Sequence, residues 1–393
     1  MPISKKISEY LKQGSWIRKL FEEGAQMLND GSGLPVYDFS IGNPDLEPPK
    51  EFNDTLKRII DNEQSGSHKY MANTGYAETK AAVADSLKRE YGLGFSAQNI
   101  IMTVGAGGAL NTILKAIIDD GEEVIVPAPY FVEYGFYTAN HNAKLVTVDS
   151  APDFDIDIDK IESAITERTR AVIITNPNNP TGFLYPQKTL NALGEMLRRK
   201  SKGLTRPIFL IDDAPYRKLV YDVEKCTAAF LAYENTIMGT SHSKDLGLPG
   251  ERIGYLAISP KIQNWQLLAD GCAFANRTLG FVNAPALMQR VVAELQDVTI
   301  DLDWYRRKRD RLYKALTKMG YELPYPGGAF YMFPAAPGGD DMRFIEIMKE
   351  KRVLVVPGRG FGTPGYFRIS YCVSDEKIEG ALPAFEEAIK EIL

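Results

Sequence analysis

The chain has 393 residues, long enough for two domains and a sizeable hydrophobic core. Its 46 Lys and Arg residues against 51 Asp and Glu give a net charge of -5, so no electrostatic feature favours a nucleic-acid partner. Three scattered cysteines and three dispersed histidines form neither a disulfide framework nor a zinc pattern, and we expect no metal site.

The sequence also carries no sign of a membrane partner. Its first residues lack the apolar core of a signal peptide, and no apolar run approaches membrane-spanning length. With 44% hydrophobic and 25% charged residues, the composition is typical of a soluble enzyme. We therefore expect a cytoplasmic protein.

The first two thirds of the chain predict helices around a series of short strands. Apolar residues on helical spacing predict helices over 5–30, 50–62 and 76–91. From residue 100, β-rich runs recur at 100–105, 123–127, 144–148, 171–175, 208–212, 236–240 and 254–259. This alternation predicts an α/β fold with a mainly parallel seven-stranded sheet flanked by helices.

The pattern changes after about residue 285. A long helical stretch is expected to run to Met319, and short strands at 329–333, 353–356 and 367–371 then alternate with helices. We interpret this part as a smaller α+β domain that the N-terminal segment completes. The predicted division is 1–45 with the small domain, 46–285 as the large domain, and 286–393 as the small C-terminal domain.

A glycine cluster, Gly105 to Gly108, follows the first β-rich run and precedes a helical stretch. Backbone N–H groups there could hold an anion at the N-terminus of the helix. The rival interpretation is a dinucleotide fingerprint, but Leu110 occupies the position of its last glycine, and the next strand ends without an acidic residue for a ribose. An anion cradle is favoured, and a plain tight turn is the other alternative.

The most specific stretch is 240–255, which reads T-S-H-S-K-D-L-G-L-P-G-E-R-I-G-Y. Burial of Lys244 would lower its pKa and make the neutral amine available as a nucleophile or Schiff-base former. Ser241 and Ser243 before it, and Arg252 after it, would suit a phosphate held nearby. Taken alone, the four residues S-H-S-K would also suit an exposed turn with a solvated lysine.

The whole stretch resembles the cofactor-lysine segment of the fold-type I pyridoxal-phosphate enzymes, in the aspartate aminotransferase family. The resemblance covers nearly the whole chain, with the family's motifs in the expected order. It implies pyridoxal 5'-phosphate as the cofactor, bound by the large domain, and a homodimer with shared active sites. It also implies transfer of an amino group between an L-amino acid and a 2-oxo acid, with aspartate or glutamate and 2-oxoglutarate as the expected substrates.

The resemblance assigns the cofactor contacts residue by residue. Lys244 carries the cofactor and moves a proton from the substrate Cα, while Asp213 faces the pyridine nitrogen and Tyr216 the 3'-oxygen. Asp212 is the rival of Asp213, one residue out of register. The other predicted contacts are the ring-stacking Phe131, Asn179 at the 3'-oxygen, the phosphate-binding Gly105, Ala106, Gly107, Ser241, Ser243 and Arg252, and Tyr70 from a neighbouring subunit.

Two arginines are the candidates for binding the carboxylate groups of the substrate. Arg368 lies in an apolar predicted strand, where an arginine needs an anionic partner. A structural salt bridge is one alternative; the resemblance implies a bidentate grip on the α-carboxylate, helped by Gly42 and Asn179. Arg277 lies near the expected place of an arginine that reads a distal carboxylate from the neighbouring subunit. A surface arginine, or an apolar pocket for aromatic or aliphatic side chains, is its alternative.

Other functions have less support. A pyridoxal-phosphate-dependent carbon–sulfur β-lyase would share every one of these residues, and it is the runner-up. An NAD-dependent oxidoreductase is disfavoured by Leu110, and a cofactor-binding transcription regulator by the lack of a predicted DNA-binding domain before the first helix. One departure from the family is Gly107, which stands where relatives often carry a hydroxyl or a lysine.

Overall fold

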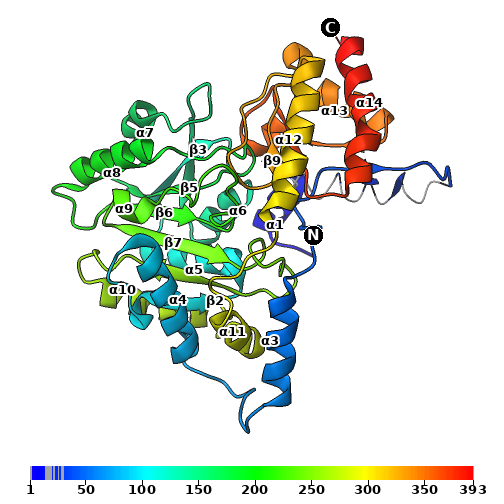
Figure 1. The fold of residues 1–393 in the computed structure, drawn as a ribbon. Helices are drawn as coiled ribbons and strands as arrows, with labels where there is room; N and C mark the ends of the chain where they lie inside the picture. The colour runs from blue at the N-terminus through cyan, green and yellow to red at the C-terminus, as the bar shows by residue number, and fades with distance from the viewer. Residues whose placement is uncertain (1, 14–19, 21–22, 25, 28–30, 393) are drawn as a thin grey trace.

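The computed structural model describes residues 2–13, 20, 23–24, 26–27 and 31–392, and a large twisted sheet forms its centre (Figure 1). The strand order is β2-β8-β7-β6-β5-β3-β4, and every neighbouring pair is parallel except the two that β8 makes. This confirms the predicted α/β fold with a mainly parallel seven-stranded sheet. The strands are β2 (Ile100–Thr103), β3 (Glu123–Ala128), β4 (Lys144–Asp149), β5 (Thr169–Thr175), β6 (Phe209–Asp213), β7 (Thr236–Ser241) and β8 (Gly254–Ile258).

Helices cover both faces of this sheet, which is why its central strands are buried along their whole length. Successive side chains point to opposite faces: Ile173 packs in the cluster that contains residues of α5 and α10, and Ile174 in the cluster that contains residues of α8. Figure 1 shows α7 and α8 on one side of the sheet and α5 and α10 on the other. The helices are α4 (Ala77–Tyr91), α5 (Gly105–Ile117), α6 (Glu133–Asn140), α7 (Ile158–Ala164), α8 (Gln187–Ser201), α9 (Ala229–Ala232) and α10 (Trp265–Thr278).

A second group of elements lies beside the large sheet and comes mainly from the C-terminal part of the chain (Figure 1). Three short strands form an antiparallel sheet in the order β11-β12-β9, and β10 pairs in parallel with β1. The strand β1 therefore joins a segment near the N-terminus to elements more than 300 residues later. These elements are β1 (Tyr37–Asp38), α12 (Leu302–Met319), β9 (Tyr331–Met332), α13 (Asp341–Glu350), β10 (Val353–Leu354), β11 (Val356–Pro357), β12 (Phe367–Ser370) and α14 (Asp375–Ile392).

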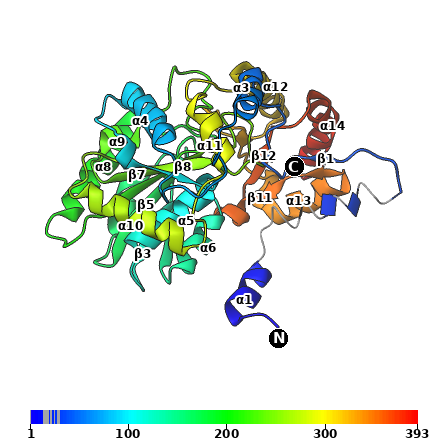
Figure 2. The ribbon, with the colours of Figure 1, turned by 90° about the horizontal axis from the view of Figure 1, so that it is seen from below.

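Two helices near the start of the chain lie at the periphery. The helix α1 (Lys5–Gln13) rests against α6, where the ring centres of Tyr10 and Phe136 are 4.9 Å apart (Figure 2). The helix α3 (Lys50–Asp61) packs against α11 (Ala286–Ala293). None of the helices in the described part of the chain combines the length and apolar character that a membrane span requires.

The structure corrects three expectations about element boundaries. The helical stretch expected up to Met319 is two helices, α11 and α12, because residues 294–301 carry the chain from the large sheet to the second group of elements. The helix after the glycine cluster begins at Gly105 itself. The strand expected over 353–356 is divided between β10 and β11, which pair with different partners. Much of the helix expected over 5–30 lies outside the described residues.

Candidate active site

Lys244 lies in the turn that follows β7, at the edge of the sheet where the parallel strands end. Its Nζ donates a hydrogen bond to the backbone oxygen of Gly42 at 2.7 Å and lies 5.5 Å from the ring centre of Phe330. Burial lowers the pKa of Lys244 to about 8, and the guanidinium groups of Arg252 and Arg368 add to this effect. An amine with this pKa is partly neutral at physiological pH, so it can act as a nucleophile or a base.

Asp213 is the last residue of β6, and its carboxylate reaches the same edge of the sheet. The Tyr134 hydroxyl donates to Oδ2 at 2.5 Å, while Oδ1 is buried and accepts no hydrogen bond from the described residues. Burial raises the pKa of Asp213 to about 7, and the bond from Tyr134 opposes that rise. Asp212 points away from the cavity, since successive side chains of a strand alternate between faces.

One end of the site is suited to a phosphate. The helix α5 begins at Gly105, whose φ of +74° is readily available to glycine. A Cβ on Gly105 would lie 2.8 Å from Nη2 of Arg252, so the missing side chain lets the guanidinium approach the helix N-terminus. The positive end of the helix dipole, its free N–H groups and this cation together attract an anion. Ala106, Gly107, Ser241 and Ser243 line the same cavity.

Arg368 of β12 enters the site from the smaller antiparallel sheet. Its Nη1 donates to Oδ1 of Asn179 at 3.0 Å, and its Nη2 donates to the backbone oxygen of Ser40 at 2.5 Å. The guanidinium carbon lies 4.7 Å from the ring centres of both Tyr331 and Phe361. The side chain is buried, and its hydrogen-bond partners among the described residues, Asn179 and Ser40, are uncharged, so the structure favours an anionic ligand over a structural salt bridge.

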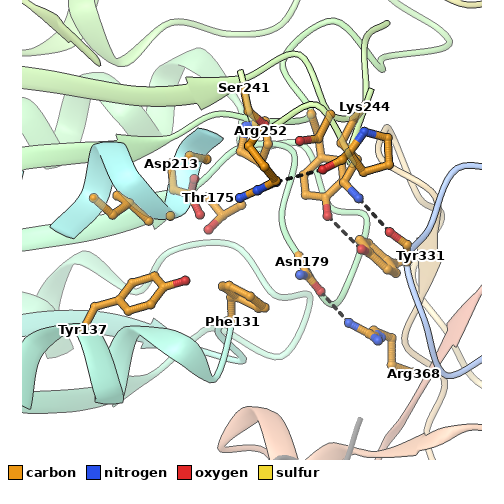
Figure 3. A pocket seen from close by; sticks show the side chains of 18 residues that line it. Phe131, Tyr137, Thr175, Asn179, Asp213, Ser241, Lys244, Arg252, Tyr331 and Arg368 are labelled. Atoms are coloured by element: carbon orange, nitrogen blue, oxygen red, sulfur yellow. Dashed lines mark hydrogen bonds between the residues drawn. The ribbon is translucent and has the colours of Figure 1, made fainter. Parts of the chain in front are cut away.

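These groups surround one cavity of about 320 Å³, into which Lys244, Asp213 and Arg368 all point (Figure 3). Pyridoxal phosphate fits the donor set: the unpartnered Oδ1 of Asp213 suits a protonated pyridine nitrogen, and the start of α5 with Arg252 suits the phosphate. The lining residues are Gly42, Ala106, Gly107, Leu110, Phe131, Tyr137, Thr175, Asn179, Asp213, Pro215, Tyr216, Ser241, Ser243, Lys244, Pro249, Arg252, Tyr331 and Arg368.

Three predicted site residues are not among the residues that line the cavity of their own chain: Gly105, whose neighbours Ala106 and Gly107 do line it, Tyr70 and Arg277. Tyr70 is 90% exposed in a loop. Arg277 is exposed on α10, where its guanidinium lies 5.1 Å from the ring centre of Phe274. Tyr70 and Arg277 were expected to serve the site of a neighbouring subunit, which a single chain does not test, so their roles stay predictions.

Sequence reasoning missed several side chains that the fold brings to the cavity. Tyr137 of α6 and Thr175 at the end of β5 line the cavity, and Tyr134 of α6, which does not line it, is bonded to the hydroxyl of Thr175 and to Asp213. Tyr331 comes from β9. A usable signal existed for Thr175, because ligands bind where parallel strands end. The tyrosines carried no such signal, since a tyrosine among apolar residues is ordinarily part of the core.

Comparison with known proteins supports the assignment of a pyridoxal-phosphate enzyme. The family model for aminotransferase class I and II matches residues 35–385. The aspartate/prephenate aminotransferase of Thermus thermophilus is 32% identical, over 91% of this chain and 92% of its own length. Aromatic-amino-acid aminotransferase 2 of Thermococcus litoralis is also 32% identical, over 96% of each chain.

Solved structures agree with these sequence relatives. An amino transferase from Eubacterium rectale superposes with a TM-score of 0.96 at 41% identity, covering 100% of this chain and 99% of its own. The aspartate aminotransferase of Thermus thermophilus with maleate gives a TM-score of 0.88 at 28% identity, over 99% of this chain and 100% of its own.

The fold and the site are thus those of a fold-type I pyridoxal-phosphate enzyme. The chain belongs to the class I and II aminotransferase family, and it is a pyridoxal-phosphate-dependent transaminase that acts on amino acids and 2-oxo acids.

Proposed function

We propose that this transaminase works from the cavity around Lys244, with aspartate or glutamate as amino donor and 2-oxoglutarate as acceptor. One observation carries the assignment of roles: three groups converge on one cavity, namely an amine of lowered pKa, a buried arginine, and a buried carboxylate with one oxygen that no described residue bonds. These are the three groups that a transaminase needs at the substrate Cα, the ring nitrogen and the substrate carboxylate.

When bound, pyridoxal phosphate supplies an electron sink for the charge that develops at the substrate Cα. Arg368 binds the α-carboxylate through two N–H groups. Asn179 and Gly42 line the same cavity, and the Asn179 side chain and the Gly42 N–H would bind the same carboxylate. Lys244 then takes the proton from Cα as a base and returns it as an acid during the other half of the transfer. Asp213 keeps the ring nitrogen protonated, and Tyr216 faces the ring oxygen.

The group that binds the side chain of the substrate is the part of the site that the lining residues define least. The cations that line the cavity, Lys244, Arg252 and Arg368, are already assigned to cofactor and α-carboxylate. A second arginine for a distal carboxylate would be Arg277 from a neighbouring subunit. The names of relatives support this acidic class, since several are aspartate aminotransferases.

An aromatic donor is a second candidate with its own support. Leu110, Phe131 and Tyr137 give the cavity apolar walls, and one relative is named an aromatic-amino-acid aminotransferase. The carbon–sulfur β-lyase needs the same groups around Lys244, but none of the relatives reported above carries that name.

We also propose a homodimer with shared active sites, because Tyr70 and Arg277 do not line the cavity of their own chain and the family resemblance assigns them to the cavity of a neighbouring subunit. The domain division at residues 45 and 285 belongs to the same proposal and is supported by the pairing of β1 with β10. A cytoplasmic location is likewise proposed, on the strength of the amino-acid composition.

The proposal is tested by labelling followed by a donor panel. Borohydride treatment of the holoenzyme should fix the cofactor to Lys244, as read by peptide mass, and Lys244→Ala should lose roughly 10²–10⁴-fold or more in turnover. Aspartate and glutamate should then give the highest kcat/KM with 2-oxoglutarate. Labelling of another lysine would overturn the site, whereas release of pyruvate and ammonia from cysteine conjugates without amino transfer would favour the lyase.

A further inference from the structure

Tyr331 of β9 contacts groups from both of the sheets that border the cavity. It is 2% exposed, and its hydroxyl lies 2.7 Å from the hydroxyl of Tyr216, which follows β6 of the large sheet. Its ring lies against the guanidinium of Arg368 at 4.7 Å. Figure 3 shows Tyr331 between Lys244 and Arg368. One side chain therefore links the two sheets across the site.

The hydrogen bond between the hydroxyls of Tyr216 and Tyr331 has one preferred donor once the cofactor is bound. Each tyrosine hydroxyl carries one hydrogen, so only one member of the pair donates to the other. If Tyr216 donates its hydrogen to the ring oxygen of the cofactor, as proposed above, then Tyr331 must donate to Tyr216. A hydroxyl that accepts a hydrogen bond becomes a better donor, because bonds in a chain polarise one another. Tyr331 would thus strengthen the bond that Tyr216 offers to the cofactor.

The ring of Tyr331 has a separate effect on Arg368. The guanidinium is held between the rings of Tyr331 and Phe361, each 4.7 Å from the guanidinium carbon, while its nitrogens bond to Asn179 and Ser40. These contacts fix the plane in which Arg368 can meet a carboxylate. The hydroxyl and the ring of Tyr331 therefore act on different partners, and they can be separated by substitution.

The backbone near Lys244 is shaped around the same hydroxyl. A Cβ built on Gly42 would lie 2.0 Å from Oη of Tyr331, so a residue with a side chain could not occupy this position without displacing the tyrosine. The carbonyl of Gly42 in turn accepts the hydrogen bond from Lys244. The close approach of the segment at Gly42 thus depends on glycine and holds Tyr331 in place.

We propose that Tyr331 is a positioning residue whose hydroxyl supports the hydrogen bond from Tyr216 to the cofactor and whose ring orients Arg368 for the substrate carboxylate. This inference rests on the proposed role of Tyr216. It predicts that Tyr331→Phe, which keeps the ring, changes the cofactor's environment, and that Tyr331→Leu also weakens carboxylate binding.

The test is a spectrophotometric pH titration of the bound cofactor in the holoenzyme. Tyr331→Phe should raise the midpoint of this titration by about 0.5–1 pH unit. The weakened hydrogen bond from Tyr216 stabilises the ring-oxygen anion less, so the protonated form of the cofactor persists to higher pH. Tyr216→Phe should raise it further, and the double variant should titrate like Tyr216→Phe alone. KM for the amino donor should be nearly unchanged in Tyr331→Phe and raised several-fold in Tyr331→Leu.

The matched control is Tyr321→Phe, which removes another buried hydroxyl with one hydrogen bond, to the backbone oxygen of Phe385 at 2.9 Å. Its midpoint should equal that of the unmodified enzyme. Equal shifts in Tyr321→Phe and Tyr331→Phe would mean a merely structural effect and overturn the inference. An unshifted Tyr331→Phe beside a shifted Tyr216→Phe would also overturn it, while an unshifted Tyr216→Phe would overturn the proposed role of Tyr216 as well.

Discussion

The Tyr134 hydroxyl donates to Oδ2 of Asp213 at 2.5 Å and is itself bonded to the hydroxyl of Thr175. A chain of two hydroxyls therefore supports one oxygen of the carboxylate, and the other oxygen has no hydrogen-bond partner in the part of the chain that the structure describes. This arrangement stabilises the ionised form of a carboxylate whose pKa burial raises to about 7.

Tyr134→Phe should therefore make Asp213 harder to ionise. Loss of a hydrogen bond to a charged group is expected to lower kcat roughly 10-fold, and the acid limb of the pH–kcat profile should move to higher pH. Tyr233→Phe is the control, because the partners of its buried hydroxyl among the described residues all lie outside the cavity, one being the backbone oxygen of Ile208 at 2.9 Å. An unchanged acid limb in Tyr134→Phe would contradict the prediction.

The two adjacent aspartates should behave differently. Asp213→Asn is expected to bind the cofactor yet lose on the order of 10²–10³ in kcat, because a neutral amide cannot hold the ring nitrogen protonated. Asp212→Asn, the matched control one residue earlier, should retain most of its turnover, since Asp212 does not line the cavity. A larger loss of kcat in Asp212→Asn would show that the carboxylates are assigned in the wrong order.

Cofactor capture by the cofactor-free enzyme should depend on pH through Lys244. Its pKa is lowered to about 8, and only the neutral amine attacks the aldehyde. The rate of absorbance change after adding pyridoxal phosphate should therefore rise with pH and level off above about pH 8 or 9. A rate that keeps rising towards pH 10.5, the ordinary value for lysine, would contradict the lowered pKa.

Shared sites can be tested by mixing two defective chains. Tyr70→Ala should weaken cofactor binding in a dimer, and Lys244→Ala should remove turnover. If Tyr70 serves the partner's cavity, a hybrid of the two variants contains one intact site, so activity should return when the chains are exchanged. A monomer in sedimentation, or no recovery in hybrids whose formation has been verified, would contradict a shared site.

Arg277 offers the sharpest test of substrate class. If it pairs with a distal carboxylate, Arg277→Ala should reduce kcat/KM for aspartate and glutamate by roughly 2–5 kcal/mol of transition-state binding and leave alanine or phenylalanine nearly unchanged. Arg311→Ala, which removes an exposed arginine paired with Glu379, is the control and should affect no donor. Equal losses for all donors would remove the case for a dicarboxylate preference.

The sequence predicted the large sheet well because each buried strand is a short apolar run punctuated by turn residues. It could not place the break at residues 294–301, since both flanking helices carry the same apolar spacing and only the tertiary path decides where one ends. Lys244 was identifiable because a charge at the end of a buried strand is costly, and Asp213 was identifiable only through the family resemblance, which selected it over Asp212. Tyr134 and Tyr331 were not, because their roles arise from partners 79 and 115 residues away.

The pairing of β1 with β10, and the bond from Arg368 to Ser40, have a consequence for synthesis of the chain. During translation, the elements that surround the phosphate end emerge long before Arg368. Folding of the carboxylate end must wait until nearly the whole chain has left the ribosome, because its contacts close a loop of 328 residues. A nascent chain should thus be able to bind the phosphate of the cofactor before it can bind the carboxylate of a substrate.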